Sequence, residues 1–236
     1  MCGVIGYYSE KPNKEDKNLI SNLIYQSKIR GLHSFGITYR SEASEYITEK
    51  KFKVEDIELP NTNMLIGHNR YSTSGNWKKN INNQPIELND NYLVFNGVID
   101  MASKKEMENK HKIRMNTDND GEIFLHYLKK IDPVEILKNL KCSFAGLFIK
   151  NKEIYCIRNK HRPLWRVVIN KSVFIASTQD IFKRSGCEDA APIQKNKLIK
   201  LKELIDTKKG IQKLSYPDDG NWGYRSSVFL PTLHSK

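Results

Sequence analysis

The order in which strands and helices are expected along the chain is the feature that most constrains its fold. Residues 2–8 (CGVIGYY) form an apolar run that predicts a buried strand, and leucine and isoleucine then recur at helical spacing within residues 15–28. Further strands are expected over 36–39, 64–68, 92–95, 144–149, 154–158, 167–169, 173–176 and 198–201, and further helices over 121–130 and 134–139. Strands therefore come in runs separated by helices, without the strand–helix–strand alternation of a parallel sheet. This order favours a layered α+β fold.

The length of the chain and the distribution of its polar residues predict one domain. The 236 residues are near the upper end of what one compact domain holds. We expect a domain over 1–214, followed by an aromatic tail over 215–236 that either docks a partner or folds back over its own domain. No apolar run approaches the roughly 20 residues of a membrane-spanning helix. Because the N-terminal segment turns polar too early for a secretory signal, the expected location is the cytoplasm, with no membrane contact.

The distribution of charge argues against a nucleic-acid-binding site, and the spacing of the cysteines argues against a metal site. The formal net charge is +12, but the basic residues are mostly lysines spread along the whole chain, so nucleic acid is not expected as a partner. The four cysteines lie far apart in the sequence and form no CxxC pair: Cys2, Cys142, Cys156 and Cys187. We therefore expect no metal site, and we expect no cofactor.

Cys2 is the candidate nucleophile. A thiol with a pKa of about 8.5 is only a few per cent thiolate at neutral pH, so its reaction requires a base. If Met1 is removed, the α-amine of Cys2, with a pKa near 8, becomes a base within the same residue. Removal of Met1 is chemically plausible because cysteine is a small second residue. Cys2 would then carry both the nucleophile and its proton acceptor.

Several short motifs follow Cys2 in a fixed order. They are MCGVIG at 1–6, RGLHSFG at 30–36, GHNRYSTSG at 67–75, NNQPI at 82–86, FNG at 95–97, DGE at 120–122, FAGLF at 144–148, RNKHRPL at 158–164 and IAST at 175–178. In this order they resemble the class II glutamine amidotransferases, which include the glutaminase domains of amidophosphoribosyltransferase, glucosamine-phosphate synthase and asparagine synthetase. The resemblance spans about residues 1–200. It implies the four-layer αββα sandwich of N-terminal-nucleophile hydrolases, two antiparallel sheets with helices outside.

The resemblance also implies a set of residues that bind glutamine. Arg70 would hold the α-carboxylate, because a guanidinium offers two parallel charged hydrogen bonds, and Thr73 would add a hydroxyl to the same group. Asp120 would hold the ammonium. Arg30 would lie near the active cysteine, although a role at a helix end accounts for it equally well. Taken by itself, Arg70 would be read as a structural or surface arginine.

Asn96 and Gly97 are the implied oxyanion hole of the catalytic site. The side-chain NH2 of Asn96 and the backbone N–H of Gly97 would stabilise the tetrahedral intermediate, and glycine would let the chain approach the reacting carbon closely. The other interpretation of this Asn-Gly pair is a type I′ hairpin turn.

Two positions depart from the family pattern, and one expected part is not recognisable. His33 stands where the family commonly has aspartate in RGxDSxG, which places a titratable group near the site. Asn159 follows Arg158 where the family has an Arg-Asp pair. No nucleotide-binding or phosphoribosyl-binding motif is found, so the ammonia acceptor is expected to be a separate synthetase or other protein.

The function implied is glutamine hydrolysis by acyl transfer through a thioester on Cys2, with release of ammonia. Two alternatives remain open. The first is a hydrolase that acts on another γ-glutamyl amide, and the second is a silent regulatory or binding homologue.

Overall fold

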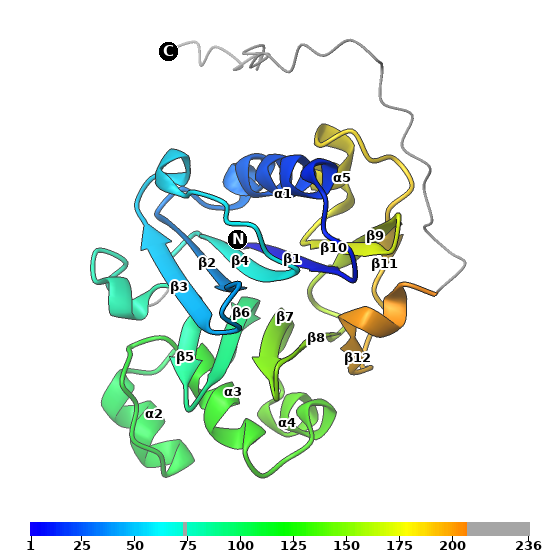
Figure 1. The fold of residues 1–236 in the computed structure, drawn as a ribbon. Helices are drawn as coiled ribbons and strands as arrows, with labels where there is room; N and C mark the ends of the chain where they lie inside the picture. The colour runs from blue at the N-terminus through cyan, green and yellow to red at the C-terminus, as the bar shows by residue number, and fades with distance from the viewer. Residues whose placement is uncertain (73–74, 207–236) are drawn as a thin grey trace, which may run out of the picture.

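The computed structural model describes residues 1–72 and 75–206, and these form two antiparallel sheets with helices on their outer faces (Figure 1). The strands are β1 (Gly3–Ser9), β2 (Ser34–Arg40), β3 (Tyr46–Lys51), β4 (Met64–Arg70), β5 (Ile86–Leu88), β6 (Asn91–Val98), β7 (Ser143–Lys150), β8 (Glu153–Arg158), β9 (Trp165–Ile169), β10 (Ser172–Ala176), β11 (Ala191–Pro192) and β12 (Ile199–Lys200). The α-helices are α1 (Lys14–Gln26), α2 (Lys104–His111), α3 (Gly121–Leu128), α4 (Pro133–Leu140) and α5 (Gln179–Arg184). The expected tail over 215–236 and the side chain of Thr73 lie outside the described residues.

The strand order explains how the two sheets are built. The larger sheet runs β11-β9-β10-β1-β4-β2-β3, and the smaller sheet runs β12-β8-β7-β6-β5. Alternate residues of β1 face opposite sides: Ile5 and Tyr7 belong to the cluster under α1, whereas Val4 belongs to the cluster between the sheets. Because β1 is covered on both faces, it is apolar over most of its length. The sequence-based prediction of a buried strand at 2–8 is therefore confirmed.

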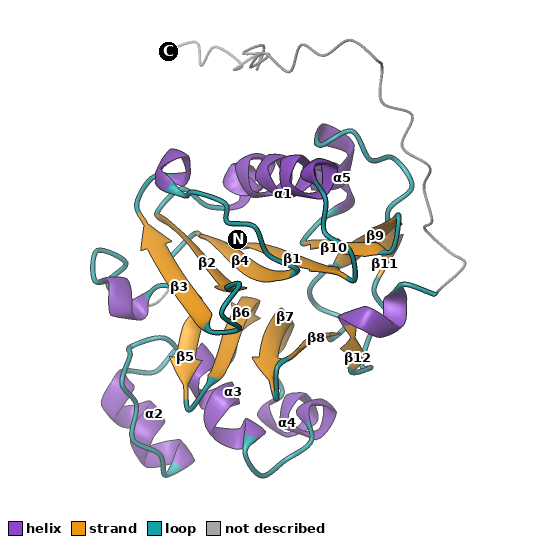
Figure 2. Cartoon of the chain, in the orientation of Figure 1, coloured by secondary structure: helices purple, strands orange, loops and turns teal. Residues whose placement is uncertain are grey.

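The helices form the two outer layers. In Figure 2, α1 and α5 lie on one side of the paired sheets, and α3 and α4 lie on the other. Apolar contacts agree with this view, since one cluster joins α1 and α5 to the larger sheet and another joins α3 and α4 to the smaller sheet. The predicted four-layer αββα sandwich is thus the observed architecture. Among the helices of residues 1–72 and 75–206, none is long and apolar enough to span a membrane.

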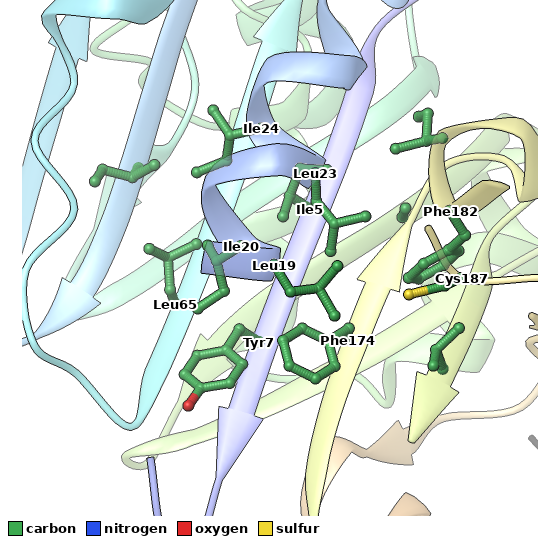
Figure 3. Packing of buried hydrophobic residues seen from close by; sticks show 14 of the residues in the cluster. Ile5, Tyr7, Leu19, Ile20, Leu23, Ile24, Leu65, Phe174, Phe182 and Cys187 are labelled. Atoms are coloured by element: carbon green, nitrogen blue, oxygen red, sulfur yellow. The ribbon is translucent and has the colours of Figure 1, made fainter. Parts of the chain in front are cut away.

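Helix α1 shows how local sequence produces one of these layers. The Asn13 side chain accepts a hydrogen bond from the Asp16 backbone N–H at 2.8 Å, which caps the first turn. Leu19, Ile20 and Leu23 then pack on β1 and Phe174, as Figure 3 shows. The helix ends at Gln26 and continues into a short 3-10 turn over Ser27–Arg30. This turn carries Arg30 towards the N-terminal end of β1.

Strand register brings the predicted motifs to one end of the sandwich. β1 and β4 are antiparallel with Gly3 opposite Asn69, so the end of β4 lies beside the start of β1. β2 pairs with β4 so that Ser34 lies opposite Arg70. Gly31 packs directly on this segment, because a Cβ atom there would lie 2.2 Å from the Arg70 carbonyl carbon. A side chain at residue 31 would therefore push the RGLHSFG segment off β4.

Candidate active site

Cys2 lies immediately before the central strand β1, at the end where β4 finishes. Its backbone nitrogen donates to Asn96 Oδ1 at 3.3 Å, and its Sγ lies 3.5 Å from the Tyr71 carbonyl oxygen. Burial raises the pKa of the Cys2 thiol, and the positive charges of Arg70 and Arg30 oppose that rise in part. The thiol is therefore mostly protonated at neutral pH, and its use as a nucleophile requires a nearby base.

The chain carries Met1, so the Cys2 nitrogen in this structure is a peptide amide. It occupies the place that the α-amine would take after Met1 is removed. The Sδ of Met1 lies 3.6 Å from Arg30 Nη2 and 3.7 Å from Arg162 Nη1, and Met1 is well exposed. Arg30 also donates from Nε to the Cys2 carbonyl at 3.3 Å. Arg30 therefore contacts the cysteine itself, as the family resemblance implied.

Asn96 lies within β6 and is 3% exposed. Its Oδ1 accepts from the Cys2 nitrogen, whereas its Nδ2 is buried with no hydrogen-bond partner among the described residues. An unpartnered buried N–H donor is energetically unfavourable in a folded protein and calls for a specific explanation. A donor held beside a nucleophile is suited to bind a developing oxyanion.

The alternative interpretation of Asn96-Gly97 as a hairpin turn is wrong. β6 continues through both residues and pairs with β7, with Asn96 opposite Ala145 and Gly97 opposite Phe144. The structure shows a further reason for glycine at residue 97. A Cβ atom on Gly97 would lie 2.0 Å from the Ser143 carbonyl oxygen, so the close approach is to β7.

Arg70 is the last residue of β4, and its side chain is buried. Its Nη1 donates to the Asn82 carbonyl and, at 2.6 Å, to Asn83 Oδ1. Burial lowers the pKa of Arg70, while Cys2 and Asp120 act to raise it. The guanidinium keeps its charge in this polar setting because an arginine pKa lies far above neutrality.

Asp120 lies at the start of α3 and is also buried. Its Oδ2 accepts from the backbone N–H groups of Ile99 at 2.6 Å and Asp100 at 3.1 Å. Burial raises the pKa of Asp120, and these two hydrogen bonds oppose the rise. They also connect Asp120 to the segment that follows the oxyanion candidate Asn96.

Two asparagines join these parts, and sequence reasoning gave them no role. The Asn82 side chain donates to Asp118 Oδ2 at 3.0 Å and accepts from the Asp118 N–H at 2.9 Å, and Asn119 Nδ2 donates to the Asn82 carbonyl at 3.0 Å. With Asn83 bound to Arg70, the NNQPI segment thus bridges the Arg70 and Asp120 regions. The signal in the sequence was the NNQPI motif, which placed both asparagines in the family pattern without assigning either a role.

A cavity of about 370 Å³ lies beside Arg30 and Tyr71, two residues that contact Cys2. Its lining comes from the N-terminus, the turn after α1 and the residue after β4: Met1, Lys28, Ile29, Arg30, Gly31, Leu32, His33 and Tyr71. A larger cleft of about 1210 Å³ lies between α1 and residues 57–63, and no predicted site residue lines it. The smaller cavity adjoins the site through Arg30 and Tyr71, although Cys2 and Asn96 are not among its lining residues. No cluster of three or more metal-ligating side chains occurs within 1–72 and 75–206.

The structure thus brings together Cys2, Asn96 and Arg30 by direct contact, and Gly97 follows Asn96 on the same strand. Arg70 and Asp120 exert an electrostatic influence on one another, and Arg70 and Cys2 do so as well. Thr73 lies outside the described residues.

Known proteins similar to this chain are glutamine amidotransferases. Residues 68–184 match a model described as a glutamine amidotransferase domain. A glutamine–fructose-6-phosphate aminotransferase of Fusobacterium nucleatum is 25% identical, over 92% of this chain and 39% of its own length. An amidophosphoribosyltransferase of Archaeoglobus fulgidus is 31% identical, over 63% of this chain and 35% of its own length.

A solved structure extends the likeness to the fold. The glutamine phosphoribosylpyrophosphate amidotransferase of B. subtilis, complexed with ADP and GMP, superposes with a TM-score of 0.60 at 18% identity, covering 82% of this chain and 45% of that one. The chain thus spans less than half the length of each of these relatives. The chain is thus similar in sequence to glutamine amidotransferases, and it has the fold of the N-terminal-nucleophile amidotransferases.

Proposed function

We propose that this chain hydrolyses the side-chain amide of glutamine through a thioester on Cys2 and supplies ammonia to an acceptor protein. The observation that carries the proposal is the Cys2–Asn96 pair. Asn96 Oδ1 holds the Cys2 nitrogen at 3.3 Å, and its buried Nδ2 has no partner among the described residues. One side chain therefore contacts the nitrogen that would become the base and also carries an N–H donor without a partner among the described residues.

The proposed reaction needs only residues of the chain, glutamine and water. In the mature protein the Cys2 α-amine takes the thiol proton while Sγ attacks the glutamine amide carbon. Asn96 Nδ2 and the Gly97 N–H stabilise the oxyanion, the amine passes its proton to the leaving nitrogen, and ammonia departs. Water then cleaves the γ-glutamyl thioester and leaves glutamate. In this scheme Arg70 and Thr73 bind the α-carboxylate and Asp120 binds the ammonium.

Removal of Met1 is the first expected result. With Met1 attached, the Cys2 nitrogen is an amide that cannot accept the thiol proton. Intact-mass measurement of the active protein is expected to show loss of one methionine. A preparation in which the methionine is retained should be inactive with glutamine. Full activity in a uniformly unprocessed preparation would contradict the α-amine mechanism.

The proposed acceptor protein covers the mouth of the site. Ile29, Leu32 and Tyr71, which remain after loss of Met1, line the cavity and are 54%, 64% and 51% exposed. Large apolar side chains grouped at an opening are typical of a surface that another protein covers. Contact there would keep ammonia from escaping into water. The domain over 1–214 would supply this surface, whatever the role of residues 215–236.

A co-expression experiment tests the acceptor proposal. One product of the neighbouring genes is expected to raise kcat/KM for glutamine at least several-fold. Leu32→Lys should remove most of that increase, measured as the ratio of kcat/KM with and without the neighbour for each variant. Met101→Lys is the matched control, because Met101 is 71% exposed and does not line the cavity. High activity of the isolated chain, unchanged by any neighbour, would show a self-sufficient glutaminase.

A further inference from the structure

His33 makes a set of contacts that the glutaminase chemistry does not use. Its Nδ1 lies 2.9 Å from the backbone nitrogen of Ser72, and its ring stacks between Tyr71 and Trp77 with both centroid distances at 5.1 Å. Trp77 in turn meets the edge of Phe52 at 6.0 Å. The imidazole is therefore the centre of an aromatic stack beside the mouth of the Cys2 site.

The hydrogen bond to Ser72 fixes the chemical state of the ring. A backbone nitrogen can only donate, so Nδ1 must act as the acceptor. An imidazole nitrogen accepts only when it carries no proton, and imidazolium has N–H donors at both nitrogens. Protonation of His33 would therefore place two donors against each other and break this contact.

The segment that His33 holds is the one that faces the nucleophile. The His33 backbone N–H donates to the Arg70 carbonyl at 3.0 Å, and its ring accepts from Ser72, so both sides of Tyr71 are tied to this residue. The Tyr71 carbonyl lies 3.5 Å from Cys2 Sγ. Movement of the His33 ring would thus shift the backbone that contacts the Cys2 thiol and that carries the Arg70 side chain.

We propose that His33 is a positioning residue whose neutral form holds Arg70, Tyr71 and Ser72 in the geometry that glutamine hydrolysis requires. The proposal rests on the proposed function. Histidine is the side chain that ordinarily changes charge between about pH 5 and 8, whereas the aspartate common in this family accepts hydrogen bonds throughout that range. This chain would therefore lose activity on mild acidification for a reason that those relatives do not share.

The charged surroundings of His33 are mixed. Lys28 and Arg30 line the same cavity, Lys78 follows Trp77, and Asp118 packs against Gly75. Lys28 is paired with Glu55 at 2.6 Å, and Asp118 is engaged by Asn82 at 3.0 Å. None of the described residues that line the cavity with His33 carries a carboxylate.

The test compares kcat/KM for glutamine across pH in three mature proteins. His33→Asn keeps an acceptor at the place of Nδ1 but does not titrate, and His33→Phe keeps a ring to stack but has no acceptor. At each pH, kcat/KM of wild type is divided by kcat/KM of His33→Asn. This ratio cancels titrations that the two proteins share, such as that of the α-amine. We expect this ratio to be constant above about pH 8 and to fall about fivefold or more by about pH 5, the loss of roughly one hydrogen bond. His33→Phe should be less active than His33→Asn at every pH.

A second measurement separates this proposal from the function on which it rests. The backbone amide resonance of Ser72 should shift with pH in wild type, as His33 titrates, and stay fixed in His33→Asn. Labelling of Cys2 by an electrophilic glutamine analogue tests the function independently. Suppose that Cys2 is labelled but the ratio of kcat/KM between wild type and His33→Asn does not change with pH, or that the Ser72 resonance of wild type does not respond to pH. The role of His33 is then refuted, and the function stands. If no labelling occurs, the function fails while the Ser72 titration still decides the His33 contact.

Discussion

Replacing Cys2 with alanine is expected to abolish ammonia release from glutamine, with kcat falling by roughly 10⁴-fold or more, as for the loss of a catalytic nucleophile. Cys2 is the cysteine whose nitrogen contacts Asn96 and whose sulfur faces the cavity end of β4. Steady-state ammonia and glutamate assays measure the loss. Mass spectrometry after treatment with an electrophilic glutamine analogue should find the label on Cys2 alone.

The other three cysteines provide matched controls. Burial raises the pKa of Cys142 and of Cys187 to about 11, and that of Cys156 to about 12. These thiols are therefore protonated at neutral pH, and none of them lies within the contacts described for the site. Their alanine variants should keep activity at a temperature where the fold is intact. Label on any of them, or residual turnover in Cys2→Ala close to wild type, would mean that the nucleophile is a different residue.

Replacing Asn96 with alanine is expected to lower kcat by about 10²–10³-fold, equivalent to about 2.7–4 kcal/mol, because an oxyanion-hole donor acts mainly in the transition state. Its Nδ2 has no hydrogen-bond partner within residues 1–72 and 75–206, which leaves this donor for the proposed intermediate. Asn96→Asp separates the two functions of this side chain. It keeps an oxygen that can accept from the Cys2 nitrogen, but it replaces the donor with a charge that repels the oxyanion.

The kinetic pattern distinguishes Asn96 from the proposed substrate residues. Both Asn96 variants should change kcat far more than KM. Arg70→Lys should chiefly raise KM, because an ammonium cannot reproduce the paired hydrogen bonds of a guanidinium, and Asp120→Asn should act similarly through the ammonium of glutamine. A variant of Asn96 that raised KM with kcat unchanged would show that this side chain binds substrate uniformly and does not stabilise the intermediate.

Local structure was predictable where burial repeats at a fixed spacing. The helix expected over 15–28 is observed as Lys14–Gln26, because its apolar residues all face β1. Helix α2 was not expected, since Met107 is its one buried residue and a polar segment gives no periodic signal. A capping box between Ser103 and Glu106 defines its start. β3 was missed for a similar reason, because this edge strand is only partly buried.

Cys2 and the order of the motifs indicated the family, the layered α+β fold and a short set of candidate residues from the sequence alone. They could do so because the side chains needed for one chemistry recur in one order along the chain. Tertiary structure alone decided how those residues meet. Cys2 and Asn96 are 94 positions apart and touch because the start of β1 faces β6 across the two sheets. It also showed that Gly97 is required by β7, that Asn82 and Asn83 join the two halves of the site, and that the His33 ring holds Ser72. Periodicity reports only whether a residue is buried, whereas strand register and side-chain hydrogen bonds depend on partners that are distant in the sequence and are fixed only when the sheets pack.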